Sequence, residues 1–200
     1  IGCARIGIRV IGTRNQQSAV FASLALNFMA GGIRSAVIVS PGPALTNCAT
    51  GLLVAHDNQW PVLVISGRRS SLYKKGNFQE LDGTSLLQPL CKYVAHVDSL
   101  DSVRESLEEA FRACYAQPSG AVLLDFNEDI LPRKAVFRPV SPLALKNLTN
   151  PLDVLPAADV HTLLATLANA QRPVLIAGSG LRWSADWPAL LGLVEALNLP

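Results

Sequence analysis

Apolar residues along the first part of the chain follow two alternating spacings. Short apolar runs, typical of strands covered on both faces, alternate with longer segments in which apolar residues recur every three or four positions, as in a half-buried helix. The runs predict strands at residues 8–11, 36–39, 62–66, 93–97 and 121–126, and the periodic segments predict helices at 18–30, 46–55 and 102–114. This alternation predicts a doubly wound parallel α/β sheet whose domain ends near residue 131.

Two of these helices carry further local signals. The buried face expected for the first helix consists of Phe21, Leu24, Ala25 and Phe28. Gly31 is expected to end that helix, because glycine accepts the left-handed conformation. In the helix at 102–114, the spacing of Ser102 and Glu105 predicts a capping box. The stripe expected to be buried there is Val103, Leu107, Ala110, Phe111 and Cys114.

Two polar segments fall where ligands bind in such sheets. Residues 12–19, Gly-Thr-Arg-Asn-Gln-Gln-Ser-Ala, join the first strand to the first helix, and the carboxyl ends of parallel strands are the usual binding edge. Residues 67–85 predict a long irregular loop. Its basic side chains either form a solvated surface or attract an anionic substrate. They are Arg68, Arg69, Lys74 and Lys75.

Prolines divide the chain into parts. Five of them fall between residues 132 and 156, which predicts an extended linker at 132–156 between a first domain, 1–131, and the start of a second α/β domain, 157–200. In the second part we expect a helix at 157–170, a strand at 173–177, a turn at 178–180 and a helix ending near residue 198. Since both ends of the chain fall beside helices, we expect a fragment of a longer protein.

Composition narrows the class of protein. Half of the 200 residues are apolar and 16% are charged, so the chain can bury a large core. The net charge of +2 and the scattered basic residues argue against a nucleic-acid partner. Polar residues, glycine or proline interrupt every apolar run before it reaches the length of a membrane span, so we expect no membrane partner.

The cysteines and histidines suggest no metal site. The four cysteines, which show neither a CxxC pair nor histidines at zinc-ligand spacing, are Cys3, Cys48, Cys91 and Cys114. We interpret them as reduced core thiols, which favours the cytoplasm or an organelle matrix. The histidines have no partners at useful spacing in the sequence and are interpreted as structural: His56, His96 and His161.

Six short segments occur in an informative order: residues 12–19, 41–47, 50–52, 60–67, 78–80 and 120–125. Together they resemble the pyrimidine-binding domain of thiamine diphosphate enzymes. The nearest branches are acetolactate synthase and the 2-hydroxyacyl-CoA and oxalyl-CoA lyases. The resemblance covers about residues 9–129, and residues 171–180 resemble the start of the middle domain of that family.

The resemblance implies a cofactor held between two subunits. Thiamine diphosphate would lie between the pyrimidine-binding domain of one subunit and the diphosphate domain of another, which implies a homodimer or tetramer acting on a small molecule. The family binds Mg²⁺ in the diphosphate domain through a GDG motif, and that motif is absent from these 200 residues. The middle domain binds FAD in some relatives, which makes FAD a further candidate cofactor.

Gln16 stands where the family has a glutamate that activates the cofactor. That carboxyl group shares a proton with a ring nitrogen of the aminopyrimidine and so promotes removal of the thiazolium proton. Glutamine has the same shape and can donate an N–H bond, but it has no proton to exchange. The resemblance therefore implies that Gln16 binds the cofactor while proton removal slows by about 10²–10⁴-fold. Gln17 matches a glutamine that is common in the family.

Other positions carry binding roles by the same resemblance. Those matched to cofactor contacts are Pro43, Asn47 and Gln79, and those matched to the substrate side are Phe78, Arg68 and Arg69. Judged from the residues alone, Asn47 would be a helix cap and Phe78 a core aromatic. Two departures from the family pattern are Ala44, in place of the second glycine of Gly-Pro-Gly, and Asn127, in place of the proline of Asp-x-Pro.

The sequence leaves three functions open. The first is a carboligase or lyase acting on a 2-oxo acid or a 2-hydroxyacyl thioester. The second is a catalytically impaired paralogue that keeps the fold for assembly or regulation, as the loss of the carboxylate would permit. The third is an unrelated nucleotide-binding module. It rests only on residues 178–180, which lack the third glycine and the acidic residue of a dinucleotide fingerprint.

Overall fold

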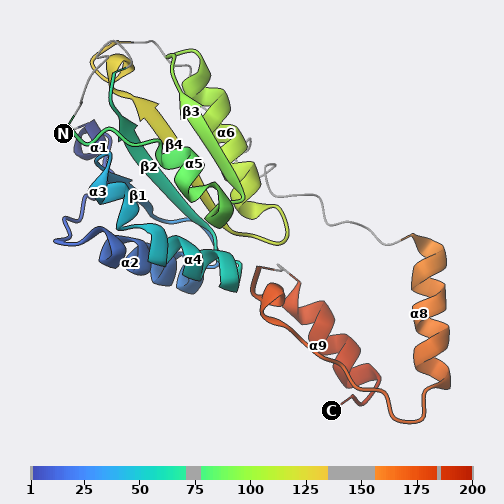
Figure 1. The fold of residues 1–200 in the computed structure, drawn as a ribbon. Coiled ribbons are helices and arrows are strands. Elements are labelled where there is room, and N and C mark those ends of the chain that lie inside the picture. Colours follow the sequence, from blue (N-terminus) through green and yellow to red (C-terminus); the bar gives the residue numbers. More distant parts are fainter. Residues whose placement is uncertain (1, 71–77, 135–155, 184–185, 200) are drawn as a thin grey trace. The chain divides into compact units, whose positions relative to one another are not determined.

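The computed structural model describes residues 2–70, 78–134, 156–183 and 186–199 (Figure 1). The chain divides into two compact units, residues 1–149 and 150–200. Lys74, Lys75 and nearly all of the predicted linker lie outside the described residues. The domain boundaries at residues 131 and 156 therefore stay predictions.

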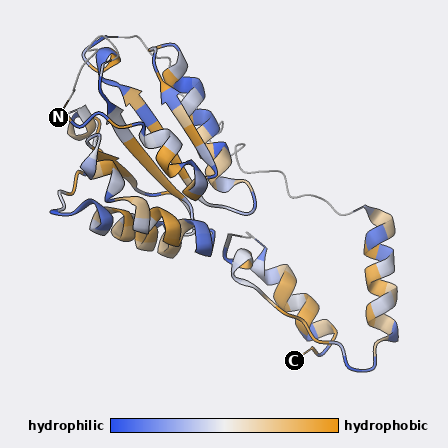
Figure 2. Ribbon diagram, in the orientation of Figure 1, coloured by the Kyte–Doolittle hydropathy of each residue, from blue (hydrophilic) through white to orange (hydrophobic). Residues whose placement is uncertain are grey.

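The first unit is built on a four-stranded parallel sheet. Its strands are β1 (Ala36–Val39), β2 (Val62–Arg68), β3 (Tyr93–Val97) and β4 (Ala121–Asn127), arranged in the order β1-β2-β4-β3. The two central strands, β2 and β4, are hydrophobic along most of their length (Figure 2). Such strands need helices on both faces, as a doubly wound sheet provides. The predicted α/β class is thus confirmed.

Alternate residues of the strands face two separate cores. Val62, Val64 and Leu123 pack with α2 (Gln16–Ala30) and α4 (Ala49–Asn58) on one face. Leu63 and Leu124 pack with α6 (Ser102–Tyr115) on the other. Since strand side chains alternate between faces, every central strand contributes to both cores.

The helix α2 begins two residues before its predicted start and buries a partly different face. Asn15 caps its start by accepting a hydrogen bond from the Ser18 N–H (3.3 Å), and Gly31 ends it with φ 67°. The buried side chains are Val20, Ser23, Leu24 and Asn27, whereas Phe21 and Ala25 are exposed. The predicted face is thus correct for Leu24 and wrong for Phe21 and Ala25, and Phe28 is partly buried, where it stacks on Trp60.

Asn27 can be buried because its amide group bonds two separate stretches of backbone, at residues 34–35 and at Pro61. Its Oδ1 accepts from the N–H groups of Arg34 (2.8 Å) and Ser35 (3.0 Å), and its Nδ2 donates to the carbonyl of Pro61 (3.1 Å). A buried amide with all its partners costs little, and this one fixes the turn that leads into β1.

Two other helix predictions need correction. Instead of one helix at 46–55, a short α3 (Pro43–Thr46) precedes α4, and Asn47 and Cys48 separate them. In α6 the capping box does not form. Asp101 is the N-cap residue, and the Ser99 Oγ accepts from the Ser102 N–H (3.2 Å).

The long polar loop predicted at residues 67–85 also contains regular structure, since α5 (Gly83–Leu87) and the 3₁₀ helix η1 (Gln88–Leu90) follow Asp82.

Residues 8–11 do not form the predicted strand. They follow a short helix, α1 (Gly2–Arg5), and their apolar side chains are exposed, with Val10 at 67% and Ile11 at 69%. A strand is stabilised by pairing with a neighbour, and among the described residues this segment has no strand partner. The apolar run therefore indicated that this segment could form a strand, but a strand forms only where a neighbouring strand pairs with it.

The second unit contains helices α8 (Ala157–Asn169) and α9 (Trp187–Ala196) and a 3₁₀ helix, η3 (Ser179–Trp183). The predicted helices are confirmed, but residues 173–177 form no strand, and Ile176 is 90% exposed. The cause is the same as for residues 8–11, because this segment also has no strand partner among the described residues.

All four cysteines are free, as predicted. Cys48 and Cys114 are buried, and burial raises their pKa values to about 11 and about 12. Cys3 was wrongly assigned to the core, since it is only partly buried on a helix that has no buried residue. No helix in the described ranges has both the length and the apolar character needed to span a bilayer.

Candidate functional site

The amide groups of Gln16 and Asn47 meet beside the start of α2. Gln16 is the first residue of α2, and Asn47 lies between α3 and α4. The Asn47 Nδ2 donates to the Gln16 Oε1 across 3.1 Å. Asn47 is the C-cap residue of α3 through its backbone, but its side chain makes no capping bond and contacts another element instead. Two residues assigned to one site from the sequence are hydrogen-bonded in the structure.

This contact leaves donor capacity on Gln16. An amide side chain has one acceptor oxygen and two N–H donors, and the Gln16 oxygen already accepts from Asn47. Among the described residues, no hydrogen bond engages the Gln16 nitrogen, and the side chain is partly exposed. Gln16 can therefore present N–H groups to a ring nitrogen of a ligand, whereas a carboxyl group at this position could also exchange a proton.

The loop after β1 closely approaches the segment that contains Gln79. Gly42 is buried with φ 65°, and a Cβ placed on it would lie 2.8 Å from the Gln79 Cβ and 3.0 Å from the Gln79 Cα. Gln79 itself has φ 63°, which is uncommon for a residue with a side chain. The absence of a Cβ at Gly42 thus lets this loop lie against the Gln79 segment.

Pro43 connects these two contacts. It starts α3 directly after Gly42, and its carbonyl accepts from the Asn47 N–H across 3.1 Å. The cofactor-side residues predicted from the sequence therefore form a continuous set. It runs from Gln16 through Asn47 and Pro43 to Gly42 and Gln79. Their binding roles stay predictions.

Phe78 is not a core aromatic, because 75% of its surface is exposed. Its backbone is held instead. The carbonyl of Phe78 accepts from the Arg69 Nε across 3.0 Å, and the Arg69 Nη1 pairs with the Glu128 Oε2 at 2.9 Å. Arg69 is therefore already engaged by both a carbonyl and a carboxylate. Its substrate role and that of Phe78 stay predictions.

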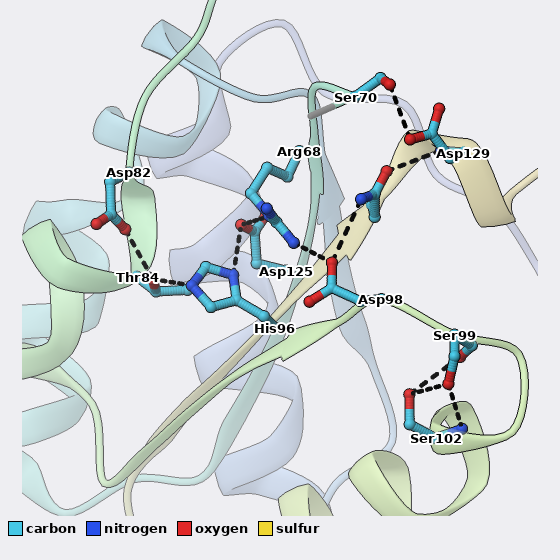
Figure 3. Close-up of polar contacts among 11 residues, drawn as sticks. Arg68, Ser70, Asp82, Thr84, His96, Asp98, Ser99, Ser102, Asp125 and Asp129 are labelled. Atoms are coloured by element: carbon cyan, nitrogen blue, oxygen red, sulfur yellow. Dashed lines mark hydrogen bonds and ion pairs between the residues drawn. The ribbon is translucent and has the colours of Figure 1, made fainter. Parts of the chain in front are cut away.

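Arg68 ends β2 inside a cluster of charged side chains (Figure 3). It forms an ion pair with Asp98, and its Nε lies 3.4 Å from the Oδ2 of Asp125. Asp125 is 1% exposed, and burial raises the pKa of its carboxyl group while Arg68 and His96 act in the opposite direction. Arg68 thus pairs with one buried acid group, Asp125, and one exposed acid group, Asp98, and its contact with substrate stays a prediction.

His96 has partners that the sequence did not reveal. Its Nδ1 lies 3.5 Å from the Asp125 Oδ2, and its Nε2 lies 2.9 Å from the Thr84 Oγ1 (Figure 3). The Thr84 hydroxyl donates to Asp82 (2.8 Å), so the His96 Nε2 is the donor to Thr84. Strand register brings His96 and Asp125 together, because they are opposite each other on β3 and β4, and the start of α5 supplies Thr84.

One signal could have identified this cluster. A charged or polar residue stands near the carboxyl end of each of the three neighbouring strands, and Ser66, Asp125 and His96 share one level of the sheet. No group of three or more potential metal ligands occurs within the described part of the chain. The polar groups near these strand ends are the amides of Gln16 and Asn47, the guanidinium of Arg68 and the carboxylate of Asp125.

Comparisons with known proteins converge on one family. Residues 2–86 match the family described as "Thiamine pyrophosphate enzyme, N-terminal TPP binding domain". The whole chain is 32% identical to the "Probable acetolactate synthase" of Mycobacterium bovis and 31% identical to the mouse "2-hydroxyacyl-CoA lyase 2", over 36% and 37% of those proteins. An acetolactate synthase of Bacillus subtilis is 31% identical over 97% of the chain and 33% of its own length. The chain thus spans about a third of the length of these curated relatives.

Proposed function

We propose that this chain holds the aminopyrimidine end of thiamine diphosphate, which is also called thiamine pyrophosphate (TPP), in a carbon–carbon lyase or transferase. The premise is that its residues 2–86 belong to the TPP enzymes, as their N-terminal TPP-binding domain. The observation that carries the proposal is the hydrogen bond between Gln16 and Asn47 at the start of α2. It joins two positions that the family resemblance assigns to one site.

The residues present fit the heterocycle in part. The side-chain N–H groups of Gln16, which no described residue engages, can donate to a ring nitrogen. Gly42, by lacking a Cβ, lets the loop that bears Pro43 lie against Gln79. When bound, the cofactor supplies a nucleophilic carbon and an electron sink for carbon–carbon bond cleavage. Gln16 orients the ring but takes up no proton, so we expect slow removal of the thiazolium proton, by about 10²–10⁴-fold.

The names of the relatives suggest the substrates. Acetolactate synthases and 2-hydroxyacyl-CoA lyases are among the similar proteins, so a 2-oxo acid or a 2-hydroxyacyl thioester is the proposed substrate class. We further propose that the chain is part of a longer protein. In that protein a second subunit of a homodimer or tetramer completes the site, and a separate domain binds the diphosphate with Mg²⁺. FAD is a further candidate cofactor.

One alternative has an observation in its favour. The amide at position 16 lacks the exchangeable proton of a carboxyl group, which would suit a catalytically impaired paralogue that keeps the fold for assembly or regulation. This alternative predicts cofactor binding without turnover.

Cofactor binding and proton exchange separate these proposals. Titration of thiamine diphosphate with Mg²⁺ into the full-length protein, followed by calorimetry, should show saturable binding. Exchange of the thiazolium proton in D₂O, followed by NMR, should be about 10²–10⁴-fold faster in Gln16→Glu than in the wild type. Gln17→Glu, which adds the same charge one residue away, is the matched control and should show no such gain.

Each outcome of this experiment has one meaning. No binding by the wild type would overturn the proposed function. Binding with equal exchange rates in the wild type and Gln16→Glu would show that the carboxylate is dispensable. Binding without turnover of pyruvate or a 2-hydroxyacyl-CoA would support the impaired paralogue, provided that Gln16→Glu restores activity.

A further inference from the structure

We propose that Arg69, held by Glu128, is a positioning residue whose guanidinium fixes the Phe78 carbonyl and thereby sets the direction of the Phe78–Gln79 segment. The inference deepens the proposed function, because it rests on that segment facing the cofactor and substrate. It assigns to Arg69 a role other than attracting an anion.

Arg69 makes two contacts at once, and both are short. Its Nε donates to the Phe78 carbonyl across 3.0 Å, while its Nη1 donates to the Glu128 Oε2 across 2.9 Å. A guanidinium is planar, so the direction of one N–H fixes that of the other. A carboxylate that holds one side of the fork therefore aims the other side at the carbonyl.

Glu128 is itself held in place. Its second oxygen, Oε1, accepts from the Ser70 N–H across 3.0 Å, and it begins a 3₁₀ turn, η2 (Glu128–Ile130), directly after β4. Ile130 anchors that turn in the core. The backbone bond from Ser70, followed by the bonds and charge of Arg69, lowers the pKa of Glu128. The carboxylate is therefore charged and fixed at neutral pH.

The other end of the segment is fixed by packing. Gln79 lies against Gly42, at a distance that admits no Cβ on the glycine. The Phe78 side chain, in contrast, is 75% exposed and has little packing of its own to orient it. The direction of this side chain therefore depends on its backbone, which is held by Arg69 at Phe78 and by Gly42 at Gln79.

The two roles of Arg69 predict opposite effects of removing Glu128. If Arg69 attracts an anionic substrate, the carboxylate competes with that substrate, and Glu128→Gln should improve substrate use. If Arg69 is a positioning residue, Glu128→Gln removes the group that aims it and should impair substrate use. Arg69→Lys adds a second distinction. It keeps the charge but replaces the planar fork with a single ammonium group.

The first experiment follows the segment directly and requires no turnover. The full-length protein is labelled with 4-fluorophenylalanine, and the Phe78 resonance is assigned as the one that disappears in Phe78→Leu. We expect Arg69→Gln, Arg69→Lys and Glu128→Gln each to shift and narrow this ¹⁹F resonance. Unchanged ¹⁹F spectra in these variants would overturn the proposal.

A matched ion pair elsewhere provides the control. Arg104 and Glu108 on α6 are separated by 2.9 Å and are 48% and 34% exposed, close to the 35% and 32% of Arg69 and Glu128. Glu108→Gln removes a comparable carboxylate without touching the Phe78 segment. It should leave the Phe78 resonance and the kinetics unchanged.

The second experiment measures pyruvate turnover with thiamine diphosphate and Mg²⁺. Losing one hydrogen bond to a charged group should lower kcat/KM by about 10- to 100-fold in Arg69→Lys and Glu128→Gln. A rise in kcat/KM for Glu128→Gln would overturn the proposal in favour of anion attraction. If the wild type fails to bind the cofactor, the proposed function fails, and the ¹⁹F spectra still decide whether Arg69 fixes the segment.

Discussion

The close approach of Gly42 to Gln79 can be tested by adding one methyl group. Gly42→Ala places a Cβ 2.8 Å from the Gln79 Cβ and 3.0 Å from two of its backbone atoms, at a position with φ 65°. Two penalties should result. One comes from the left-handed backbone, which disfavours any side chain, and the other comes from the overlap with Gln79.

A second glycine separates these penalties. Gly31 also has a positive φ, 67°, but no atom lies within 4 Å of an added Cβ, so Gly31→Ala carries a backbone penalty without the overlap. Because its ψ of 29° differs from the −125° of Gly42, the coupling with Gln79 decides how much of the difference comes from the overlap. A left-handed residue with a side chain costs about 1–2 kcal/mol, and overpacking costs about 1–3 kcal/mol more. We therefore expect Gly31→Ala to lower the free energy of unfolding by about 1–2 kcal/mol and Gly42→Ala by about 2–5 kcal/mol.

Urea unfolding of both variants, followed by circular dichroism, measures the difference. The double variant Gly42→Ala/Gln79→Gly removes one of the overlapping Cβ atoms and should recover part of the loss, with a coupling energy of about 1 kcal/mol or more. Equal destabilisation by Gly42→Ala and Gly31→Ala, or no coupling with Gln79→Gly, would refute the close approach. It would also remove the contact that fixes one end of the Phe78–Gln79 segment.

Two further predictions concern acid stability and thiol reactivity. Hydrogen bonds from Ser85 and Thr84 lower the pKa of Asp82 to about 2. Because the carboxylate is favoured in the folded state, its stabilisation is present above about pH 4 and lost as the pH falls towards 2, and thermal unfolding of Asp82→Asn should lack this loss. In brief alkylation by iodoacetamide, followed by mass spectrometry, the partly exposed Cys3 should react first, whereas the buried Cys114, with its pKa raised to about 12, should react only after unfolding. Modification of Cys114 in the folded protein would contradict its burial.

The sequence identified elements whose stabilising contacts are local. The helix at 16–30 was predicted nearly to its ends, because its cap at Asn15 and its stop at Gly31 depend on residues within one turn. The strands that pair in the sheet were predicted within two residues, since their apolar runs mark burial on both faces. The alternation of these strands and helices along the chain was enough to predict the α/β class.

Strands that lack a partner show the limit of local signals. Residues 8–11 and 173–177 have the same apolar character as β1, yet they remain unpaired among the described residues. The difference is that β1 pairs with β2 along its length. Hydropathy indicates that a segment can be buried, but hydrogen-bonded neighbours decide whether it becomes a strand.

By itself, the sequence determined which residue types stand at the ends of the strands, and it indicated through the resemblance that Gln16 and Asn47 belong to one site. Only the tertiary structure decided which side chains meet: Gln16 with Asn47, Arg69 with Glu128 and His96 with Asp125. These partners are separated by 29 or more positions, so no local periodicity links them. Strand register and the paths of the loops bring them within hydrogen-bond or ion-pair distance, and those are properties of the packed sheet.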